Sequence, residues 1–514
     1  MMPGLVFPPV LETLISFLAK EKQIYLVGGA VRDAILGRES HDLDFVMPED
    51  AGQIGRKVAN ALSGSFYMLD EERDTARVVY QLENGLPFIL DFSVFRGPGL
   101  EADQIGRDFT INALAIDLME PGKLIDPLNG FGDLKAGLLR ACASTSFTDD
   151  PVRILRGVRL ALSLDFTILP ETMSAMRQAV SKLSRTSPER QRDELFRILE
   201  GTQVSSAIRM LDQLGIIRLI LPEIESLKEV TQSSPHQFDV WEHTLLTLAN
   251  MEKLLGALFS ENVTSGTDPV KPAIDLAVSK LERFRKQLAE HFEYALTPGR
   301  SRRGLLFLAA IFHDIGKPVS RQELESGKVV FYGHERNGVP IMLKRMQAMT
   351  FSLAELDYVK TVIKQHMRLH FMGDDGVLPR RRTIYRFFRD SGLVGVDICL
   401  LSLADTLATY GDTLPPDKWM AELEICITLL EAWWERQNDV IRPLRLLTGF
   451  DLQEKFGLKP GPMIGRLLTV LEEAQACGEV ADQAEALLFV QSWLEQNADK
   501  AFAAGTGADD WRRE

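Results

Sequence analysis

"GGAVRDAILGRESHDLDFV", residues 28–46, is the stretch that decides the fold of the first part of this chain. It follows the apolar run "IYLV" and combines two glycines, a short helical segment and two aspartates, Asp42 and Asp44, that flank a leucine. Residues two apart on a strand point to the same face of a sheet, so the two carboxylates lie side by side. Two adjacent anions repel each other unless a cation lies between them. Mg²⁺, which carboxylates share with substrate phosphates, meets that requirement.

The two glycines, Gly28 and Gly29, add a second element of the same site. Without a side chain in the way, their backbone N–H groups can come close to a triphosphate. The stretch therefore predicts a site for a nucleotide and a divalent metal.

The composition excludes several other classes of protein. The chain has 514 residues, 45% of them apolar and 25% charged, as expected for a soluble globular protein of about three or four domains. The longest apolar run, at 304–312, is far shorter than the ~20 residues that a membrane span needs, and the N-terminal residues do not predict a signal peptide. The four cysteines lack the spacing of a disulfide framework or a zinc site. We expect a cytoplasmic protein without membrane contact.

The net charge limits the kinds of nucleic-acid binding that we expect. A net charge of −14, from 58 basic and 72 acidic residues, argues against a protein that coats nucleic acid non-specifically, and no DNA partner is expected. Basic strips at 185–197, 299–303 and 379–389 are candidates for holding an RNA backbone, or else are solvated helix faces.

The distribution of apolar residues predicts two kinds of structure. Runs of strand length at 24–27, 43–47, 76–82 and 88–95 fall within the first ~140 residues. From about residue 150 the apolar spacing is helical, and a helix is predicted over 151–162 with Pro151 at its first position. The predicted fold class is α+β: a mixed sheet with helices, followed by an all-α body.

Five motifs in the first ~225 residues resemble one known family in order and spacing. They are "GGAVRDAILG" with "DLD", then "RDFTINALAI" at 107–116, "DPLNGFGDLKAGLLR" at 126–140, "DDPVRILRGVR" at 149–159 and "ERQRDEL" at 189–195. The family is that of the class II tRNA nucleotidyltransferases and bacterial poly(A) polymerases, with a polymerase-beta-like nucleotidyltransferase head. The resemblance implies template-independent transfer of C and A from CTP and ATP to a 3′-hydroxyl, most often the CCA end of tRNA, by two-metal phosphoryl transfer.

The resemblance also assigns roles around the metal. Asp42 and Asp44 would bind Mg²⁺, and Asp91 in "FILDFSVF" would be a third catalytic carboxylate that helps to activate the primer hydroxyl. Arg32 would lie near the triphosphate bound at Gly28 and Gly29, although an ion pair with Asp33 is an equal alternative.

Two further motifs would read the sugar and the base. Arg107, Asp108 and Asn112 resemble the ribose-reading motif, but the family commonly has two arginines where this chain has Gly106 and Arg107, so one contact would be missing or supplied elsewhere.

Asp150 and Arg153, three residues apart on one predicted helical face, can together bind the edge of cytosine or adenine, because a carboxylate accepts from the exocyclic amino group and a guanidinium donates to the ring acceptors. Arg156 and Arg159 belong to the same motif and complete the implied nucleotide-binding set.

The stretch "LDEERDTARVV" at 69–79 falls where CCA-adding members carry a mobile loop that helps them to switch from C to A. Addition of the whole CCA is our hypothesis. Enzymes that add only CC or only A share the core motifs and remain alternatives, as does a poly(A) polymerase on the same scaffold.

A second set of motifs lies in the helical body. The order of histidines and aspartates in these motifs resembles that of the HD phosphohydrolases. The resemblance implies a metal site with the ligands His243, His313, Asp314 and Asp405. Two further histidines, His334 and His366, are candidates for binding a second metal. Imidazole and carboxylate ligands suit Mn, Ni, Co or Fe, which can activate water for phosphoester hydrolysis. We expect a phosphodiesterase or phosphatase acting on RNA 3′ ends or small cyclic phosphates. The alternatives are an HD fold kept only for tRNA docking, or an RNA-binding protein whose only turnover is at this domain.

The resemblance divides the chain into four parts. These are a nucleotidyltransferase head at 1–142, a helical neck that recognises the base at 143–225, an HD phosphohydrolase-like domain at 226–415 and a C-terminal helical tRNA-binding region at 416–514.

Overall fold

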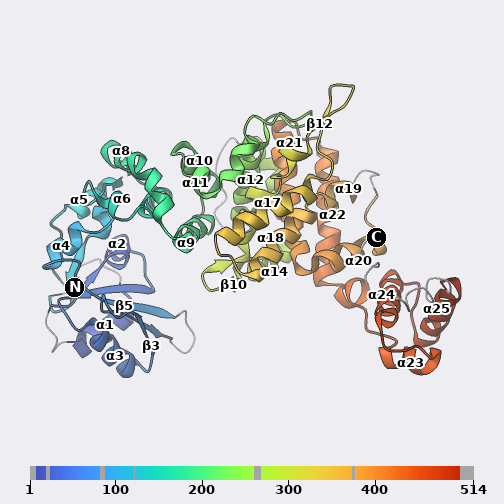
Figure 1. Ribbon diagram of the computed structural model, residues 1–514, viewed down its shortest axis with the longest axis horizontal. Coiled ribbons are helices and arrows are strands. Elements are labelled where there is room, and N and C mark those ends of the chain that lie inside the picture. The colour runs from blue at the N-terminus through green and yellow to red at the C-terminus, as the bar shows by residue number, and fades with distance from the viewer. Residues whose placement is uncertain are drawn as a thin grey trace. The chain divides into compact units, whose positions relative to one another are not determined.

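A computed structural model describes residues 7–18, 23–81, 87–120, 122–259, 268–372 and 377–497 of the chain. The chain forms two compact units, Met1–Ile220 and Leu221–Glu514 (Figure 1). The first unit contains a sheet with helices and the second is almost entirely helical, so the predicted fold class is confirmed.

The sheet of the first unit has seven strands in the order β3-β4-β5-β2-β1-β6-β7. The strands are β1 Tyr25–Val27, β2 Asp42–Met47, β3 Ser65–Asp70, β4 Thr75–Tyr80, β5 Phe88–Val94, β6 Ala115–Asp117 and β7 Leu124–Ile125. The central pair β2 and β5 is parallel, and every other neighbouring pair is antiparallel. The four strand runs predicted from the sequence match β1, β2, β4 and β5.

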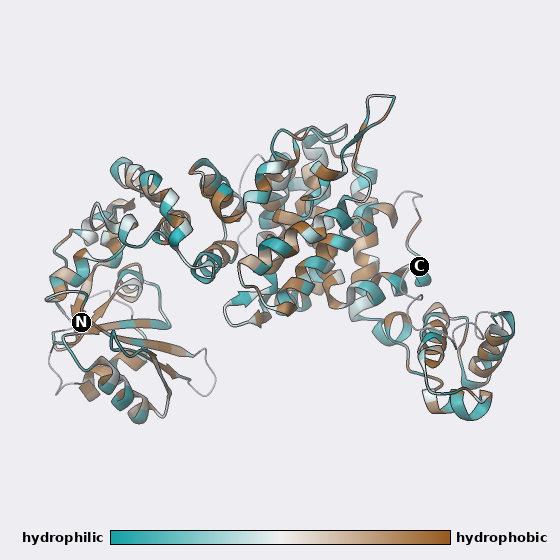
Figure 2. Cartoon of the chain, viewed as in Figure 1, coloured by the Kyte–Doolittle hydropathy of each residue, from teal (hydrophilic) through white to brown (hydrophobic). Residues whose placement is uncertain are grey.

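The two faces of the sheet follow the alternation of side chains along each strand. On one face Phe45 of β2 stacks on Phe92 of β5 with ring centroids 5.0 Å apart, beneath helix α3 (Ala51–Leu62). Gly55 of α3 lets this helix approach closely, because a Cβ there would lie 3.4 Å from the Phe92 ring. The opposite face carries Asp42, Asp44 and Asp91. Brown and teal segments alternate along these strands in Figure 2.

The sequence placed a mobile loop over residues 69–79, and the connection in the structure is much shorter than that. Most of that stretch is strand, and only the four residues 71–74 connect β3 to β4. The turn is anchored by Asp74, whose two carboxylate oxygens accept hydrogen bonds from the backbone N–H groups of Ala51 (2.7 Å) and Gly52 (2.8 Å). Asp50, the residue that precedes α3, makes no such bond with its own side chain. Asp74 therefore caps α3 from the hairpin.

The rest of the first unit is built mainly from helices. They are α1 Pro9–Leu18, α2 Gly29–Ile35, α4 Leu100–Ile105, α5 Gly130–Ala136, α6 Ser146–Asp149, α7 Arg153–Leu164, α8 Pro170–Ala179, α9 Pro188–Leu199, α10 Val204–Gln213 and α11 Ile217–Ile220. Helix α7 begins two residues after the predicted start at Pro151, which leaves Asp150 in extended backbone before the helix.

The second unit is a helical bundle followed by three smaller helices. The helices are α12 Val240–Phe259, α13 Lys271–Leu281, α14 Arg285–Glu293, α15 Arg302–Phe312, α16 Lys317–Ser320, α17 His334–Ala348, α18 Leu353–Gln365, α19 Arg368–Met372, α20 Arg381–Ser391, α21 Gly395–Tyr410, α22 Pro416–Trp434, α23 Gly449–Phe456, α24 Pro462–Cys477 and α25 Gln483–Gln496. Helices α12, α15, α18 and α21 pack against one another at the centre of the bundle. Helices α23 to α25 enclose a small core of their own, which includes Leu452, Leu467 and Val490.

One helical stretch of the described residues, Arg381–Thr413, is long and apolar enough by composition to span a membrane. However, 78% of its apolar window is buried inside the structure, as in a core helix.

The capping role of Asp74 gives a stability prediction. Replacing it with alanine should destabilise the first unit by about 1 kcal/mol, because two N–H groups at the start of α3 lose their acceptors. Thermal unfolding of the full chain measures the effect on the transition of this unit. Glu72→Ala, an exposed change in the same turn, is the control. Equal melting temperatures for the two variants would show that the cap contributes nothing.

Candidate functional site

Three carboxylates meet on the open face of the sheet. Asp44 of β2 lies directly opposite Asp91 of β5 in the parallel register, and Asp42 lies two residues before Asp44 on the same face. Asp44 and Asp91 line two adjoining cavities of about 810 and 600 Å³. The structure thus brings together the three aspartates that the sequence proposed as catalytic.

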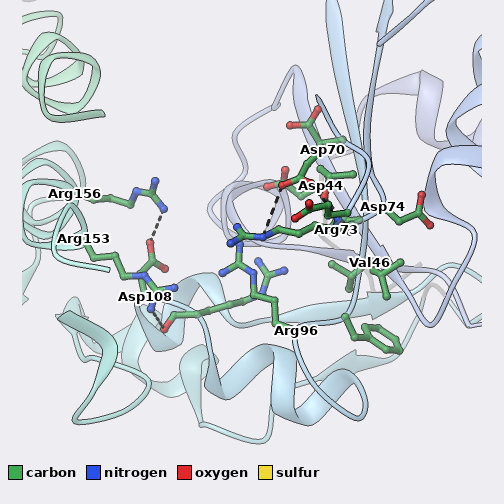
Figure 3. Close-up of a pocket in the computed structure, with 16 residues that line it drawn as sticks. Asp44, Val46, Asp70, Arg73, Asp74, Arg96, Asp108, Arg153 and Arg156 are labelled. Carbon is green, nitrogen blue, oxygen red and sulfur yellow. Dashed lines mark hydrogen bonds and ion pairs between the residues drawn. The ribbon is translucent and has the colours of Figure 1, made fainter. Parts of the chain in front are cut away.

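Nearly all of the predicted nucleotide-binding residues line these cavities. The larger cavity includes Asp44, Asp91, Arg107, Asp108, Arg153 and Arg156, several of which Figure 3 labels. The smaller includes Gly28, Gly29, Arg32, Asp42, Asp44, Asp91, Arg107, Asp108, Asn112, Arg156 and Arg159. Of the predicted residues of this site, all of them described, Asp150 alone lines neither cavity.

The carboxylate cluster has the properties of a cation site. Desolvation raises the pKa of Asp44 to about 6, and the neighbouring charges of Asp91 and Asp42 add to the rise against the opposing effect of Arg107. Side chains that destabilise one another's ionised form in this way are favourable ligands for a divalent metal, which removes the repulsion when it binds. The oxygen-only donor set fits Mg²⁺.

Arg77 holds the third carboxylate in place, and the sequence analysis missed it. It lies opposite Asp91 in the β4–β5 register and binds it through two hydrogen bonds of 2.8 Å, Nε to Oδ1 and Nη2 to Oδ2. Strand alternation was the available signal, because Arg77 lies between two fully buried residues, Ala76 and Val78.

Gly28 is required by the geometry of the turn that faces the carboxylates. Its φ of +78° lies in the left-handed region, and a Cβ would be 3.0 Å from Oδ2 of Asp44 and 3.3 Å from Arg107. Any other residue would be strained and would crowd the carboxylate. The turn therefore leaves free the space beside Asp44 that the smaller cavity occupies.

Arg32 forms the ion pair with Asp33 that the sequence offered as the alternative to a triphosphate contact. It binds Asp33 through Nε (2.8 Å) and Nη2 (2.9 Å), and its Nη1 donates to Oδ1 of Asn112 at 2.7 Å. Asn112 in turn donates to Asp108 at 3.1 Å. The ion pair with Asp33 thus forms while Arg32 still lines the smaller cavity.

Asp108 and Glu194 form a chain of charges that links the sheet to the neck helices. Burial opposes ionisation of Asp108, but Arg156 and the hydrogen bonds from Asn112 and the Phe109 N–H lower its pKa. Arg156 also binds Glu194 at 3.3 Å, and Arg159 binds the other oxygen of Glu194 at 3.1 Å. Glu194, only 3% exposed, was missed as an individual residue although its motif "ERQRDEL" was recognised. It orients two of the predicted nucleotide-binding arginines.

Asp150 and Arg153 differ from the sequence prediction. They do not share a helical face, because α7 begins only at Arg153. Arg153 donates to the backbone carbonyls of Gly106 (2.8 Å) and Arg107 (3.0 Å), while Oδ2 of Asp150 accepts from Arg190 at 2.8 Å. The other oxygen of Asp150, Oδ1, is buried and has no hydrogen-bond partner among the described residues. That oxygen is an unsatisfied acceptor buried outside both cavities.

A second candidate centre lies in the helical unit, where the ends of packed helices converge. His243 on α12, His313 directly after α15 and Asp405 on α21 form one group of close side chains, and Asp314, His334 and His366 form another. All six residues are less than 9% exposed. Nε2 of His313 is 3.2 Å from Asp314, and Nε2 of His334 is 3.3 Å from the other oxygen of Asp314. Asp314 therefore joins the two groups.

The hydrogen bonds of these histidines fit metal binding. Nδ1 of His313, His334 and His366 donates to a backbone carbonyl at 2.7, 2.8 and 2.7 Å, which leaves Nε2 of each ring as an acceptor directed at the others. Burial, and then the neighbouring histidines, lower the pKa of His366 to about 3, so its ring is neutral. Nε2 of His243 is buried 2.8 Å from Oδ1 of Asp405, so this ring, like that of His313, directs Nε2 at a carboxylate. Lys317, missed in the sequence although it lies in "HDIGK", is 2.6 Å from Oδ2 of Asp314.

The basic strip at 379–389 is largely neutralised. Arg382 and Arg386 bind Glu473 of α24, Arg382 also binds Glu479, and Arg381 binds Asp439. These arginines therefore hold the bundle and α24 together, and the solvated or structural interpretation of this strip is the one that the contacts favour.

Comparisons with known proteins match the parts of the chain that carry most of the two candidate sites. Sequence profiles match the poly A polymerase head domain at 24–140, a probable RNA and SrmB-binding site of polymerase A at 165–228, the HD domain at 281–408 and a putative second domain of tRNA nucleotidyltransferases at 434–490. The A-adding tRNA nucleotidyltransferase of Deinococcus radiodurans is 32% identical over 478 residues, 92% of this chain and 95% of the relative. The CC-adding enzyme of Thermus thermophilus is 29% identical over 94% of this chain and 96% of its own.

Solved structures show the same fold. The Thermotoga maritima CCA-adding enzyme in complex with tRNA superposes with a TM-score of 0.55 at 23% identity, over 94% of this chain and 95% of that one. A CCA-adding enzyme in complex with ATP gives a TM-score of 0.59 at 23% identity, over the same shares of the two chains.

The raised pKa of Asp44 predicts a pH-dependent effect of its replacement. In metal-free protein the ionised carboxylate is less favourable in the folded state than in the unfolded chain, where its pKa is near 3.8. Asp44→Asn should therefore raise the melting temperature above pH 6, by a small amount because solvent screens this exposed side chain. The gain should shrink as the pH falls below 6 and vanish well below pH 3.8, where the wild-type carboxyl is protonated in both states. Thermal melts in a chelating buffer test this, with the exposed Asp50→Asn as control. A gain that is the same at every pH would contradict it.

Proposed function

The chain belongs to the tRNA nucleotidyltransferases, and we propose that it adds C and A, taken from CTP and ATP, to the 3′ end of tRNA without a template. The observation that carries the proposal is the carboxylate cluster of Asp42, Asp44 and Asp91 between two cavities. A transferase of this kind must bring two substrates, a nucleoside triphosphate and an RNA 3′-hydroxyl, to one phosphorus atom. Two cavities that share their acidic wall meet that need.

The carboxylates would hold Mg²⁺, which supplies charge neutralisation at the phosphates when bound. The triphosphate would lie beside Gly28 and Gly29, where the absence of side chains leaves room, with Arg32 at the edge of the same cavity. Asp91, held in a fixed orientation by Arg77, would accept the proton of the attacking 3′-hydroxyl.

Base selection would fall to the residues before and at the start of α7. The unsatisfied oxygen of Asp150, Oδ1, would accept from the exocyclic amino group that cytosine and adenine share. Arg153 uses three of its five N–H groups on backbone carbonyls and keeps donors for the ring acceptors. Guanine and uracil lack the matching pattern, so these two side chains would replace a template base.

The proposal includes all three positions of CCA. Relatives that match more than nine-tenths of the chain are named A-adding and CC-adding, so addition of only part of the sequence is the alternative to be separated. A poly(A) polymerase is a third outcome.

Primer extension decides between these activities. Transcripts of tRNA ending at the discriminator base, at C and at CC are incubated with Mg²⁺ and with CTP, ATP or both. We expect all three to grow to CCA and stop, and Asp44→Asn to lower the rate by roughly 10³-fold or more because it removes a metal ligand. Asp50→Asn, an exposed change on the same unit, is the matched control.

The other outcomes are equally specific. Growth that stops after CC, or growth only of the CC-ended transcript by one A, assigns a partial enzyme. Long A tails on unrelated RNA favour a poly(A) polymerase. No extension of any transcript would contradict the proposal.

A second activity is favoured by the buried Nε2 atoms of His243 and His313, which lie 2.8 Å from Asp405 and 3.2 Å from Asp314, respectively. We propose that the six residues His243, His313, Asp314, His334, His366 and Asp405 bind a divalent transition metal, Mn, Ni, Co or Fe, and hydrolyse phosphoesters at RNA 3′ ends or small cyclic phosphates. Metal bound there would supply an activated water. Lys317, beside Asp314, is placed to receive a phosphate oxygen.

Metal addition tests this activity. Protein is first stripped of metal with a chelator. When Mn²⁺, Ni²⁺ or Co²⁺ is then added, it should melt at a higher temperature than the metal-free protein and hydrolyse a 2′,3′-cyclic nucleotide. His313→Ala should lose both effects, with activity falling by more than the roughly 10–100-fold typical of residues that only support a ligand. Asp44→Asn, altered in the other unit, should keep both. Stabilisation without hydrolysis would favour a domain used for tRNA docking.

The division into a head at 1–142, a neck at 143–225, an HD domain at 226–415 and a C-terminal RNA-binding region at 416–514 is part of this proposal. The expected place of action is the cytoplasm.

A further inference from the structure

Five arginines line the larger cavity beside the carboxylates, and four of them are engaged by other groups. Arg107 binds Asp103 at 3.0 Å, Arg156 binds Asp108 at 3.1 Å, and Arg153 donates to backbone carbonyls. Arg73 lies 3.8 Å from Asp70. The fifth, Arg96, lies two residues after β5 and makes no side-chain hydrogen bond or ion pair with any described residue; Figure 3 shows it pointing into the cavity.

Arg96 is exposed, and no carboxylate among the described residues pairs with it directly, although Asp103 and Asp108 lie near enough to favour its charge. Desolvation, and then the charges of Arg107 and Arg153, lower its pKa. The nearby carboxylate of Asp103 is occupied by Arg107 and by the backbone N–H of Arg96 itself, at 3.0 and 3.1 Å. When several cations line one cavity, they repel one another, and an anion that binds among them relieves this repulsion.

The position of Arg96 indicates which substrate carries that anion. The glycine turn and Arg32 line only the smaller cavity, whereas Arg96 lines only the larger. Asp44 and Asp91 form the wall that the two cavities share. If the triphosphate occupies the smaller cavity, beside Gly28, then the RNA that carries the attacking 3′-hydroxyl reaches the carboxylates through the larger cavity, beside Arg96.

We propose that Arg96 binds a phosphodiester group of the RNA strand that is being extended, close to its 3′ end. The inference rests on the proposed function and extends it with a contact to the second substrate. A guanidinium fork matches two phosphate oxygens at once, which suits Arg96 for this contact. The same chemistry would also suit the triphosphate of the incoming nucleotide, so the two sources must be tested separately.

Equilibrium binding to the full chain tests the two sources without relying on turnover. One arm measures binding of a tRNA transcript ending in CC, and the other measures binding of CTP and ATP, each in wild type, Arg96→Ala and Arg96→Lys. The control is Arg38→Ala, an exposed arginine of the same unit that lines neither cavity. A thermal melt of each variant shows that it is folded.

We expect Arg96→Ala to weaken RNA binding by about tenfold, as for a lost charge-assisted hydrogen bond, and to leave nucleotide binding unchanged. The slope of log K against log salt concentration should fall in magnitude by about 0.7, the contribution of one phosphate contact on a single strand. Arg96→Lys should recover part of the affinity, and Arg38→Ala should match wild type.

Other results overturn the assignment. Weaker nucleotide binding with unchanged RNA binding would place the triphosphate at Arg96, and no change in either arm would show that Arg96 binds neither substrate. Failure of the proposed function itself looks different, because wild type would then extend no transcript whatever the binding data show.

Discussion

The parallel pairing of β2 with β5 is the constraint on which the site of the first unit depends. It sets Asp44 opposite Asp91 and keeps Asp42 on the same face, so three negative charges share one surface. Desolvation, and then the repulsion from Asp91 and Asp42, raise the pKa of Asp44. The rest of the site compensates for that charge. Arg77 and Arg107 supply fixed cations, and Gly28 keeps the space beside Asp44 free of side chains.

Arginine–carboxylate pairs extend from this cluster into the helices that follow the sheet. Asp108 binds Arg156, and Glu194 binds Arg156 and Arg159, so a few buried acids orient the cations of the nucleotide cavity. Buried ion pairs add little net stability, because desolvation offsets their attraction. Their value here is orientation: guanidinium groups held in place lose less entropy when they bind phosphate or a base edge.

The histidine and aspartate cluster of the helical unit is assembled in a different way, from residues on several packed helices. The proposed ligands come from the ends of helices α15 and α18, the first turns of α12 and α17 and the interior of α21, all held by close packing of the bundle. Backbone carbonyls fix the tautomer of three histidines, so the direction of each Nε2 atom is decided by helix termini rather than by other side chains. The two units thus carry the proposed metal-binding groups in different places, on a sheet face in the first and mainly at helix ends in the second.

Local periodicity in the sequence determined the fold class and four of the seven strands of the main sheet, and motifs that resemble a known family named most of the residues that line the two cavities. A period of two on β2 puts Asp42 and Asp44 on one face whatever the rest of the chain does. Only the tertiary structure decided which charges pair. Arg77 meets Asp91 because β4 and β5 are neighbours, and Glu194 meets Arg156 because α9 packs on α7. The start of α7, the short turn at 71–74 and the unpaired Arg96 also depend on packing. Such contacts join residues far apart in the chain, and no local pattern of side chains specifies them.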